Sequence, residues 1–306
     1  MVSPGSSTPS RCRIPPNSEV PLRCMPTTSK RGGLDTRRAA GWVDANPHGP
    51  LALSPPEQLG WPWRRLRLPH FLGLGTQKGG TTSLQQLLEQ HPGVYLPPCK
   101  EVHYFSQHAE KPARWYAEHY RDARRGQRRG DITPFYLFHP DVPARISALL
   151  PRARMIVLLR DPVERALSQV FHARRHGFET LEVADALAAE PERLASGNAY
   201  SFQKHSYAAR SRYLEQLDRY EAMFPQRQLL VLKSEDLFTN TLAAWEKIQA
   251  FLRLRPVPLP ALPRANAGSG EANSVPAVVR AQLRDALSTT ASGVKQRYGI
   301  DWGWGE

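Results

Sequence analysis

Cysteine is scarce in this chain of 306 residues: Cys12, Cys24 and Cys99 are the only three. Two lie near the amino terminus and the third stands alone, so their spacing forms neither a disulfide framework nor a set of metal ligands. Function classes built on a structural zinc site or a disulfide scaffold are therefore not expected, and neither is a bound metal. A chain without such a framework suits a reducing compartment, which predicts a cytoplasmic protein.

Long hydrophobic runs are also missing. No stretch approaches the roughly 18 to 20 apolar residues that cross a bilayer, and the amino terminus lacks the apolar core of a secretory signal. We therefore expect a soluble protein without integral membrane association. The first 38 residues are rich in Arg, Ser and Thr and loosely resemble an organelle transit peptide. A disordered extension and a translation start at Met25 are equally open alternatives.

Acidic residues are few relative to basic ones: 28 Asp and Glu stand against 41 Lys and Arg, which gives a net charge of +13. A basic surface suits a nucleotide, an acidic glycan or nucleic acid, and a solvated basic face without a partner is an equal alternative. Neither a zinc pattern nor an aromatic-studded basic strand motif is present, so no nucleic-acid partner is expected. Nothing in the sequence indicates an oligomeric state.

Composition changes near residue 65. Residues 1–65 are crowded with Pro, Ser, Gly and Arg and show no sustained period of 2 or 3.6. Such a segment buries too little apolar surface to offset its ordering entropy, so it is predicted to be a disordered tail. Residues 66–306 have the patterning and apolar content of one large domain.

Three apolar runs in that domain read as buried strands, at residues 71–75, 155–159 and 229–232. Helical spacing accompanies each run, and a further helix is predicted near 276–287. Residues 101–105 are predicted to be extended. Buried strands that alternate with helices indicate an α/β fold: a single domain with a central parallel sheet flanked by helices. Ligands of such sheets bind at the carboxyl ends of the strands.

The loop after the first predicted strand has the features of an anion site. Gly79 and Gly80 let the backbone approach a phosphate closely, and Lys78 adds a cation. Lys78 precedes the glycine pair, whereas the lysine of the nucleotide triphosphatase P-loop follows its second glycine. Alone, the loop is as consistent with a plain turn as with a phosphate site. The following helix opens with three hydroxyl-bearing residues, Thr81, Thr82 and Ser83.

A second candidate anion site follows the strand at 155–159. Arg160 stands at its carboxyl end, and Ser168 comes eight residues later on the next helix. A guanidinium and a hydroxyl together suit a terminal phosphate. The alternative for Arg160 alone is a structural ion pair with Asp161 or Glu164, which is the commoner role of a lone arginine.

Together these motifs resemble the family of sulfotransferases that use 3′-phosphoadenosine 5′-phosphosulfate (PAPS), most closely its carbohydrate branch of heparan-sulfate-type enzymes and their bacterial relatives. Residues 71–83 are similar to the family's 5′-phosphosulfate loop, and residues 159–168 are similar to its 3′-phosphate motif. Both occur in order at a plausible separation, and the resemblance runs to the carboxyl terminus. It implies a P-loop-like sulfotransferase fold with PAPS as co-substrate.

Three more stretches resemble the family, at residues 100–105, 131–136 and 229–237. The first is similar to the segment that carries the catalytic base, with Glu101 in the place of the family's Glu. A Tyr often lies on the helix before the last of these stretches, and Tyr213 is grouped with the cofactor-binding residues on this ground. Two positions depart from the family: the late loop offers only Arg264 as a basic residue, and Ile132 replaces a Lys of some heparan-type members.

The resemblance implies a mechanism in which Lys78 stabilises the departing oxygen and Glu101 takes the acceptor's proton. If 101–105 is extended, His103 shares a face with Glu101 and could orient it or be the base itself. A surface pair of Glu101 with Lys100 is the structural alternative. The acceptor is a hydroxyl, with a glycan as first choice and a lipid, small alcohol or tyrosine as alternatives. Two rival functions are a P-loop kinase or triphosphatase, with Asp161 as magnesium ligand, and a non-catalytic polyanion-binding module.

Overall fold

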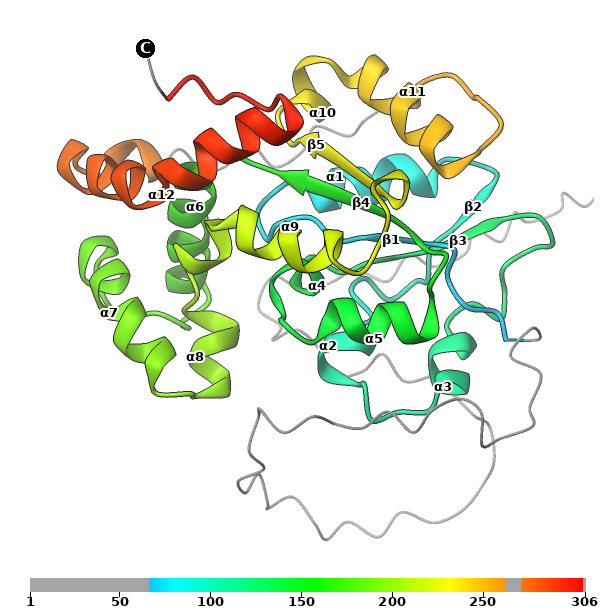
Figure 1. Ribbon diagram of the computed structural model, residues 1–306, viewed down its shortest axis with the longest axis horizontal. Helices are drawn as coiled ribbons and strands as arrows, with labels where there is room; N and C mark the ends of the chain where they lie inside the picture. Colours follow the sequence, from blue (N-terminus) through cyan, green and yellow to red (C-terminus); the bar gives the residue numbers. More distant parts are fainter. Residues whose placement is uncertain (1–65, 262–270, 305–306) are drawn as a thin grey trace, which may run out of the picture. The chain divides into compact units, whose positions relative to one another are not determined.

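The computed structural model describes residues 66–261 and 271–304. Five parallel strands form its sheet, in the order β2-β3-β1-β4-β5 (Figure 1). The predicted α/β fold with a central parallel sheet is confirmed. The predicted tail and the late loop with Arg264 lie outside the described residues. The strands are β1 (Phe71–Gly73), β2 (Val94–Tyr95), β3 (Arg128–Ile132), β4 (Arg154–Leu159) and β5 (Leu229–Lys233).

Helices follow each strand and return the chain to the amino edge of the sheet, as parallel strands require. In chain order they are α1 (Thr81–Glu89), α2 (Tyr104–Gln107), α3 (Ala113–Glu118), α4 (Phe135–Phe138), α5 (Val142–Leu149), α6 (Pro162–Arg175), α7 (Val183–Ala195), α8 (Ala199–Lys204), α9 (Tyr213–Glu221), α10 (Asp236–Thr239), α11 (Thr241–Leu252) and α12 (Ala277–Tyr298). Short 3-10 turns lie at Ala209–Ser211, Gln226–Gln228 and Glu271–Ser274.

Strand β4 is buried on both faces, which explains its uninterrupted apolar sequence. Met155, Val157 and Leu159 point to one side, where α5 and α9 pack. Ile156 and Leu158 point to the other, where α1 and α11 pack. Figure 1 shows these helix layers above and below the sheet. Each such side chain stabilises the fold by about 1.5 to 3 kcal/mol relative to exposure.

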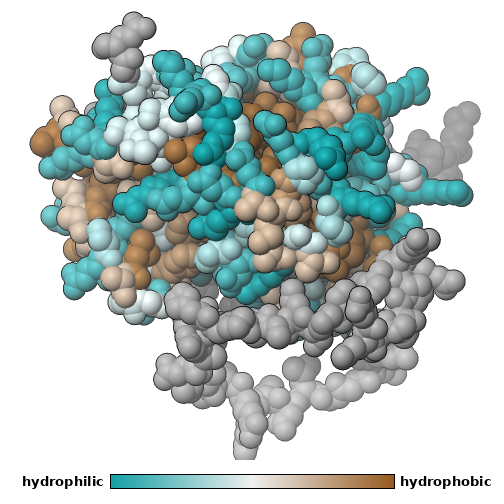
Figure 2. All heavy atoms as spheres, viewed as in Figure 1, coloured by the Kyte–Doolittle hydropathy of each residue, from teal (hydrophilic) through white to brown (hydrophobic). Residues whose placement is uncertain are grey.

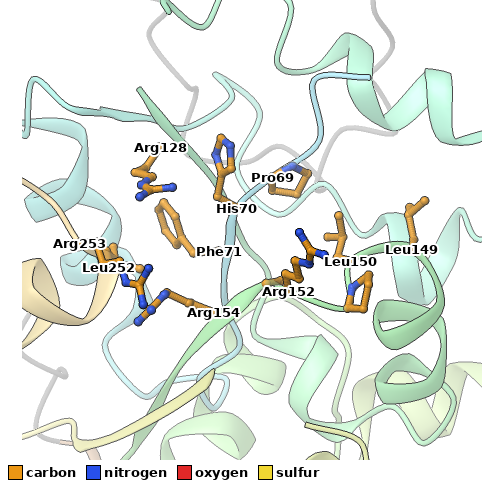
Figure 3. Close-up of a pocket in the computed structure, with 12 residues that line it drawn as sticks. Pro69, His70, Phe71, Arg128, Leu149, Leu150, Arg152, Arg154, Leu252 and Arg253 are labelled. Atoms are coloured by element: carbon orange, nitrogen blue, oxygen red, sulfur yellow. The ribbon is translucent and has the colours of Figure 1, made fainter. Parts of the chain in front are cut away.

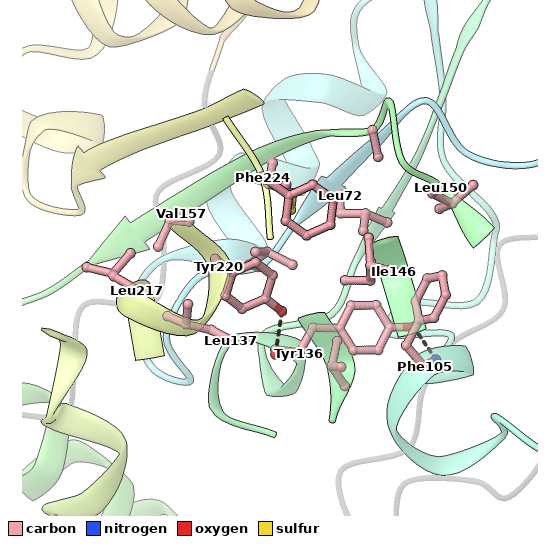
Figure 4. Packing of buried hydrophobic residues seen from close by; sticks show 14 of the residues in the cluster. Leu72, Phe105, Tyr136, Leu137, Ile146, Leu150, Val157, Leu217, Tyr220 and Phe224 are labelled. Atoms are coloured by element: carbon pink, nitrogen blue, oxygen red, sulfur yellow. Dashed lines mark hydrogen bonds between the residues drawn. The ribbon is translucent and has the colours of Figure 1, made fainter. Parts of the chain in front are cut away.

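The cluster on the α5 and α9 side mixes apolar packing with buried hydroxyl groups. Tyr220 donates a hydrogen bond of 2.7 Å to the carbonyl oxygen of Tyr136, which ties α9 to α4 (Figure 4). A third cluster joins α6, α7 and α12. On the face shown in Figure 2, hydrophilic side chains dominate and apolar ones show in smaller areas between them, as expected when the apolar residues fill the core.

The prediction of an extended segment at 101–105 is wrong. Glu101 and His103 both adopt left-handed backbone conformations, with φ of 62° and 56°. Helix α2 begins directly afterwards at Tyr104. A non-glycine residue in this region costs about 1 kcal/mol or more, so the surrounding contacts must hold the turn in place. The helix predicted near 276–287 is present and continues to Tyr298.

Candidate active site

The loop between β1 and α1 is shaped by its glycines. Gly80 has φ of 84° and caps α1 without a side-chain hydrogen bond. A Cβ atom at Gly79 would lie 2.2 Å from Thr76 Oγ1 and 2.8 Å from the Thr76 carbonyl oxygen, so no larger residue fits there. Because the cap residue Gly80 has no side chain, the first amides of α1 have no side-chain partner at the cap. Such a helix start binds anions through its free N–H groups and its dipole.

Basic side chains surround this helix start. Lys78 is half-buried, and burial, followed by the neighbouring charges of Arg175, Arg160 and Lys100, lowers its pKa. Lys100 Nζ donates a hydrogen bond of 2.6 Å to Thr82 Oγ1 at the start of α1. Cations gathered in this way raise the local concentration of a negatively charged ligand.

Arg160 joins the same loop from the end of β4. Its Nη1 donates a hydrogen bond of 3.2 Å to the carbonyl oxygen of Lys78, and its own carbonyl oxygen accepts one of 2.8 Å from the Tyr213 hydroxyl. Tyr213 is fully buried, so it positions the end of β4. In the part of the chain that the structure describes, Arg160 pairs with neither Asp161 nor Glu164, and the structural alternative for this arginine is not observed.

Both neighbouring carboxylates have other partners. Asp161 caps α6 by accepting hydrogen bonds from the amides of Val163 at 2.9 Å and Glu164 at 3.0 Å. Its second oxygen accepts one of 2.6 Å from Trp304 Nε1. Glu164 pairs with Arg280. Asp161 is thus committed to holding the helix and the carboxyl-terminal segment, which argues against its use as a magnesium ligand.

Ser168 lies on α6 and is half-buried. Among the described residues its hydroxyl has no hydrogen-bond partner, so it is available to a ligand. Ser83 and Thr81 are buried at the start of α1, whereas Thr82 is exposed. The hydroxyl-bearing residues that the sequence indicated therefore differ in solvent exposure.

Glu101 and His103 come together although their segment is not extended. Glu101 Oε2 lies 3.4 Å from His103 Nε2, and Glu101 Oε1 lies 3.7 Å from Lys100 Nζ. His103 Nδ1 is 3.1 Å from Ser106 Oγ, which fixes the ring. Burial alone would raise the pKa of Glu101, but His103 and Lys100 outweigh it and lower that pKa. The carboxylate is therefore ionised at neutral pH, as a proton acceptor must be.

Asp131 organises the wall beside this pair. It is fully buried and accepts three hydrogen bonds, from Thr133 Oγ1 at 2.7 Å, Tyr116 at 2.8 Å and Tyr136 at 2.9 Å. The Tyr136 hydroxyl in turn accepts a bond of 3.4 Å from the amide of Phe105 on α2. Burial raises the pKa of Asp131 despite these donors. The network links β3, α3, α4 and α2, the elements around Glu101.

Sequence reasoning missed Arg210. This side chain is 5% exposed, donates to the Gln77 side chain on the loop after β1, and bonds the Gln203 carbonyl at 2.6 Å. Its guanidinium lies over the rings of Phe135 and Phe138 at 4.8 and 5.1 Å. Burial and the nearby Arg165 lower its pKa to about 9. Its position three residues before Tyr213 was the one available signal.

Ser234 and Glu235 were part of a recognised stretch but had no assigned role. Ser234 Oγ donates a bond of 2.8 Å to the Gly79 carbonyl oxygen, and Glu235 accepts one of 3.0 Å from the Asp161 amide. The turn after β5 thus supports the loops after β1 and β4 together. All these loops meet at the carboxyl edge of the sheet, as the fold class predicts.

Residues 68–258 match the sulfotransferase domain family. This chain belongs to that family. It is therefore a sulfotransferase, and the family implies PAPS as the co-substrate that supplies the sulfuryl group. The resemblance drawn from residues 71–83 and 159–168 is confirmed at the level of the family.

Several known proteins are similar to the chain. The heparan sulfate glucosamine 3-O-sulfotransferase 3B1 of Mus musculus is 26% identical over 94% of this chain and 78% of its own length. The membrane-associated sulfotransferase kil1 of Dictyostelium discoideum is 41% identical over 34% of this chain, which spans 23% of that protein. The crystal structure of a sulfotransferase from Alicyclobacillus acidocaldarius superposes with a TM-score of 0.66 at 27% identity, and covers 77% of this chain and 98% of that one.

Two further observations concern metals and membranes. Within residues 66–261 and 271–304, no group of three His, Cys, Asp or Glu side chains could hold a metal ion. No helix in the same ranges is both long and apolar enough to span a bilayer.

Proposed function

We propose that this chain transfers the sulfuryl group of PAPS to a hydroxyl group of a carbohydrate. The observation that carries the proposal is the joining of three segments at the carboxyl edge of the sheet. Arg160 bonds the backbone of Lys78, and Lys100 bonds Thr82 while it lies next to Glu101. Donor-binding cations and a candidate base therefore share one site.

The donor end is divided between two motifs. The amides from Gly79 to Ser83, with Lys78, would hold the 5′-phosphosulfate, because a glycine-lined helix start and a cation suit a compact anion. Arg160 and Ser168 would hold the 3′-phosphate, since the guanidinium is at the strand end and the hydroxyl is without a partner among the described residues. Tyr213 would act through the Arg160 carbonyl that it bonds.

The transfer itself is an in-line displacement at sulfur. The acceptor oxygen forms a bond to sulfur while the bond from sulfur to the bridging phosphate oxygen breaks, and 3′-phosphoadenosine 5′-phosphate (PAP) leaves. Lys78 would stabilise the charge that builds on the bridging oxygen. Glu101 would take the proton of the acceptor hydroxyl, and His103 would hold the Glu101 carboxylate in place.

A carbohydrate acceptor is supported by the name of one relative and by the charge around the site. The mouse relative is called a heparan sulfate glucosamine 3-O-sulfotransferase, and it aligns with 94% of this chain. Basic residues at the site suit an acidic sugar chain. The choice of acceptor class is therefore tested directly with a panel of acceptors.

The test is incubation of the full chain with ³⁵S-labelled PAPS and a panel of acceptors: desulfated heparan, a simple sterol, an aliphatic alcohol and a tyrosine peptide. Label in the heparan fraction alone supports the proposal. Label in another acceptor alone retains the sulfotransferase and overturns the carbohydrate assignment. The Glu101→Gln variant is the matched control, because it should bind PAPS but leave every acceptor unlabelled above background.

A further inference from the structure

A second cavity opens at the edge of the sheet opposite to the candidate active site. It has a volume of about 480 Å³ and lies where β1, β3 and β4 begin, bordered by the turn after α5 and the end of α11 (Figure 3). In a parallel sheet all amino ends lie on one edge and all carboxyl ends on the other. The cavity is therefore separated from the PAPS site by the length of the strands.

Arginine dominates the polar lining of this cavity. Figure 3 shows the side chains of Arg128, Arg152, Arg154 and Arg253 around it. They come from three segments that are far apart in the sequence: the start of β3, the turn that leads from α5 into β4, and the residue after α11. The fold thus collects four cations around one space, which we call the arginine cavity.

Across residues 66–261 and 271–304, none of these four arginines forms an ion pair with Asp or Glu. Burial, followed by the neighbouring charges of Arg253 and Arg128, lowers the pKa of Arg154. His70, which also lines the cavity, has its pKa lowered to about 4 by burial and by Arg129 and Arg128, so it is neutral at pH 7.

The ends of two helices offset part of this charge. Arg154 Nη1 donates a hydrogen bond of 2.5 Å to the carbonyl oxygen of Phe251 in the last turn of α11, and α5 also ends at the cavity. A helix carboxyl end carries about half a negative charge, so two ends offset roughly one of the four positive charges. About three positive charges therefore remain on the arginine cavity.

We propose that the arginine cavity binds a multivalent oxyanion, carried by a phosphate or sulfate compound. Guanidinium groups bind such anions through paired N–H donors, and they do so better than lysine. The volume of about 480 Å³ lies within the range of small-ligand sites, which favours a ligand with at least two anionic groups over a single small ion. The same anionic groups can be free in solution or esterified to a sugar.

The experiment measures binding of inorganic pyrophosphate to the full chain by calorimetry, with saturating PAP present to fill the donor site. The double variant Arg128→Gln, Arg253→Gln should bind pyrophosphate about tenfold more weakly or worse, since each lost guanidinium removes charge-assisted bonds. The control is Arg284→Gln, an exposed arginine on α12 that lines no part of the cavity. It should bind as the wild type does.

A second titration separates the two sources of the anion. A disulfated disaccharide that binds about tenfold more tightly than pyrophosphate identifies a sugar ester, and equal binding identifies the free anion. Either result supports the site if the double variant loses it. The proposal is overturned if the wild type shows no pyrophosphate binding with PAP present, or if the double variant binds equally well.

Thermal melting at low salt checks the same idea without relying on tight binding. With saturating PAP again present, pyrophosphate should raise the melting temperature of the wild type and of Arg284→Gln, because it neutralises mutual repulsion in the arginine cavity. It should raise that of the double variant much less. An equal rise in all three proteins would place the bound anion elsewhere. Neither measurement depends on sulfuryl transfer, so this proposal and the proposed function can fail separately.

Discussion

At the scale of single residues, the proposed role of Glu101 as catalytic base can be tested most directly. A base acts in the transition state and contacts the donor little, so Glu101→Gln should lower turnover by roughly 10² to 10⁴-fold while PAPS affinity stays near wild type. His103→Ala should lower turnover less, because it removes only the group that holds the carboxylate. Steady-state rates at saturating donor with a confirmed acceptor provide the measurement.

The opposite result would exchange the proposed roles of Glu101 and His103. If His103→Ala abolishes turnover and Glu101→Gln changes it only a few fold, His103 is the base. The pH profile gives an independent check. Since His103 and Lys100 lower the pKa of Glu101, activity should persist as pH falls to the ordinary glutamate range and be lost only below it.

Arg160 and Ser168 should discriminate between two nucleotides. We expect Arg160→Ala and Ser168→Ala to weaken binding of PAP much more than binding of adenosine 5′-phosphosulfate, because only PAP carries the 3′-phosphate. Loss of a charge-assisted hydrogen bond costs about 1.5 to 3 kcal/mol, or roughly ten- to more than a hundredfold in affinity. Calorimetry with both ligands decides the matter, and equal weakening of the two would refute the assignment.

At the scale of elements, the connection from α6 to α7 depends on one buried carboxylate. Glu179 is fully buried and accepts bonds from Arg193 at 2.5 Å, Tyr207 at 2.8 Å and the amide of Leu181 at 3.0 Å. Burial alone would raise its pKa, but these donors outweigh it and lower the pKa to about 2. The folded state therefore binds this proton more weakly than the unfolded state does.

We expect Glu179→Gln to lower the free energy of unfolding by about 3 kcal/mol at neutral pH, since it leaves Arg193 without its charge partner. Because the pKa of Glu179 is lowered in the folded state, the stabilisation that this carboxylate provides grows as pH rises. The contribution is complete above the ordinary glutamate pKa and disappears as pH falls towards about 2. Urea unfolding of both proteins at pH 7 and pH 3 measures it. A difference that stays constant between the two pH values would contradict this account.

The elements also show what the sequence can reveal. Apolar runs located β1 and β4 because both faces of these strands are buried, and β5 because its apolar side chains pack, partly buried, against the core on both faces. The glycine pair located the loop before α1. The turn at Glu101 and His103 escaped, because left-handed φ values in non-glycine residues leave no mark in hydrophobic periodicity. Arg210 escaped for another reason: its partner Gln77 lies 133 residues earlier in the chain, and only folding brings the two side chains together.

At the scale of the whole molecule, residues 1–65 should be dispensable. Their Pro- and Ser-rich composition motivates this expectation, and the family match begins only at residue 68. A truncated chain that starts near Trp61 should keep its melting temperature and its affinity for PAP. Differential scanning fluorimetry with and without PAP tests both. A loss of several degrees, or a failure to fold, would show that the first 65 residues pack on the domain.

The last described residues, in contrast, contact the folded domain. Trp304 bonds the carboxylate that caps α6, the Asp301 carbonyl oxygen accepts a bond of 2.6 Å from Lys233, and the ring of Trp302 lies 6.1 Å from that of Tyr213. These contacts lie beyond residue 258, where the family match ends. A fragment cut to the family boundaries would lose these contacts with the ends of β4 and β5. For expression and immobilisation, a fusion partner or affinity tag therefore belongs at the amino end.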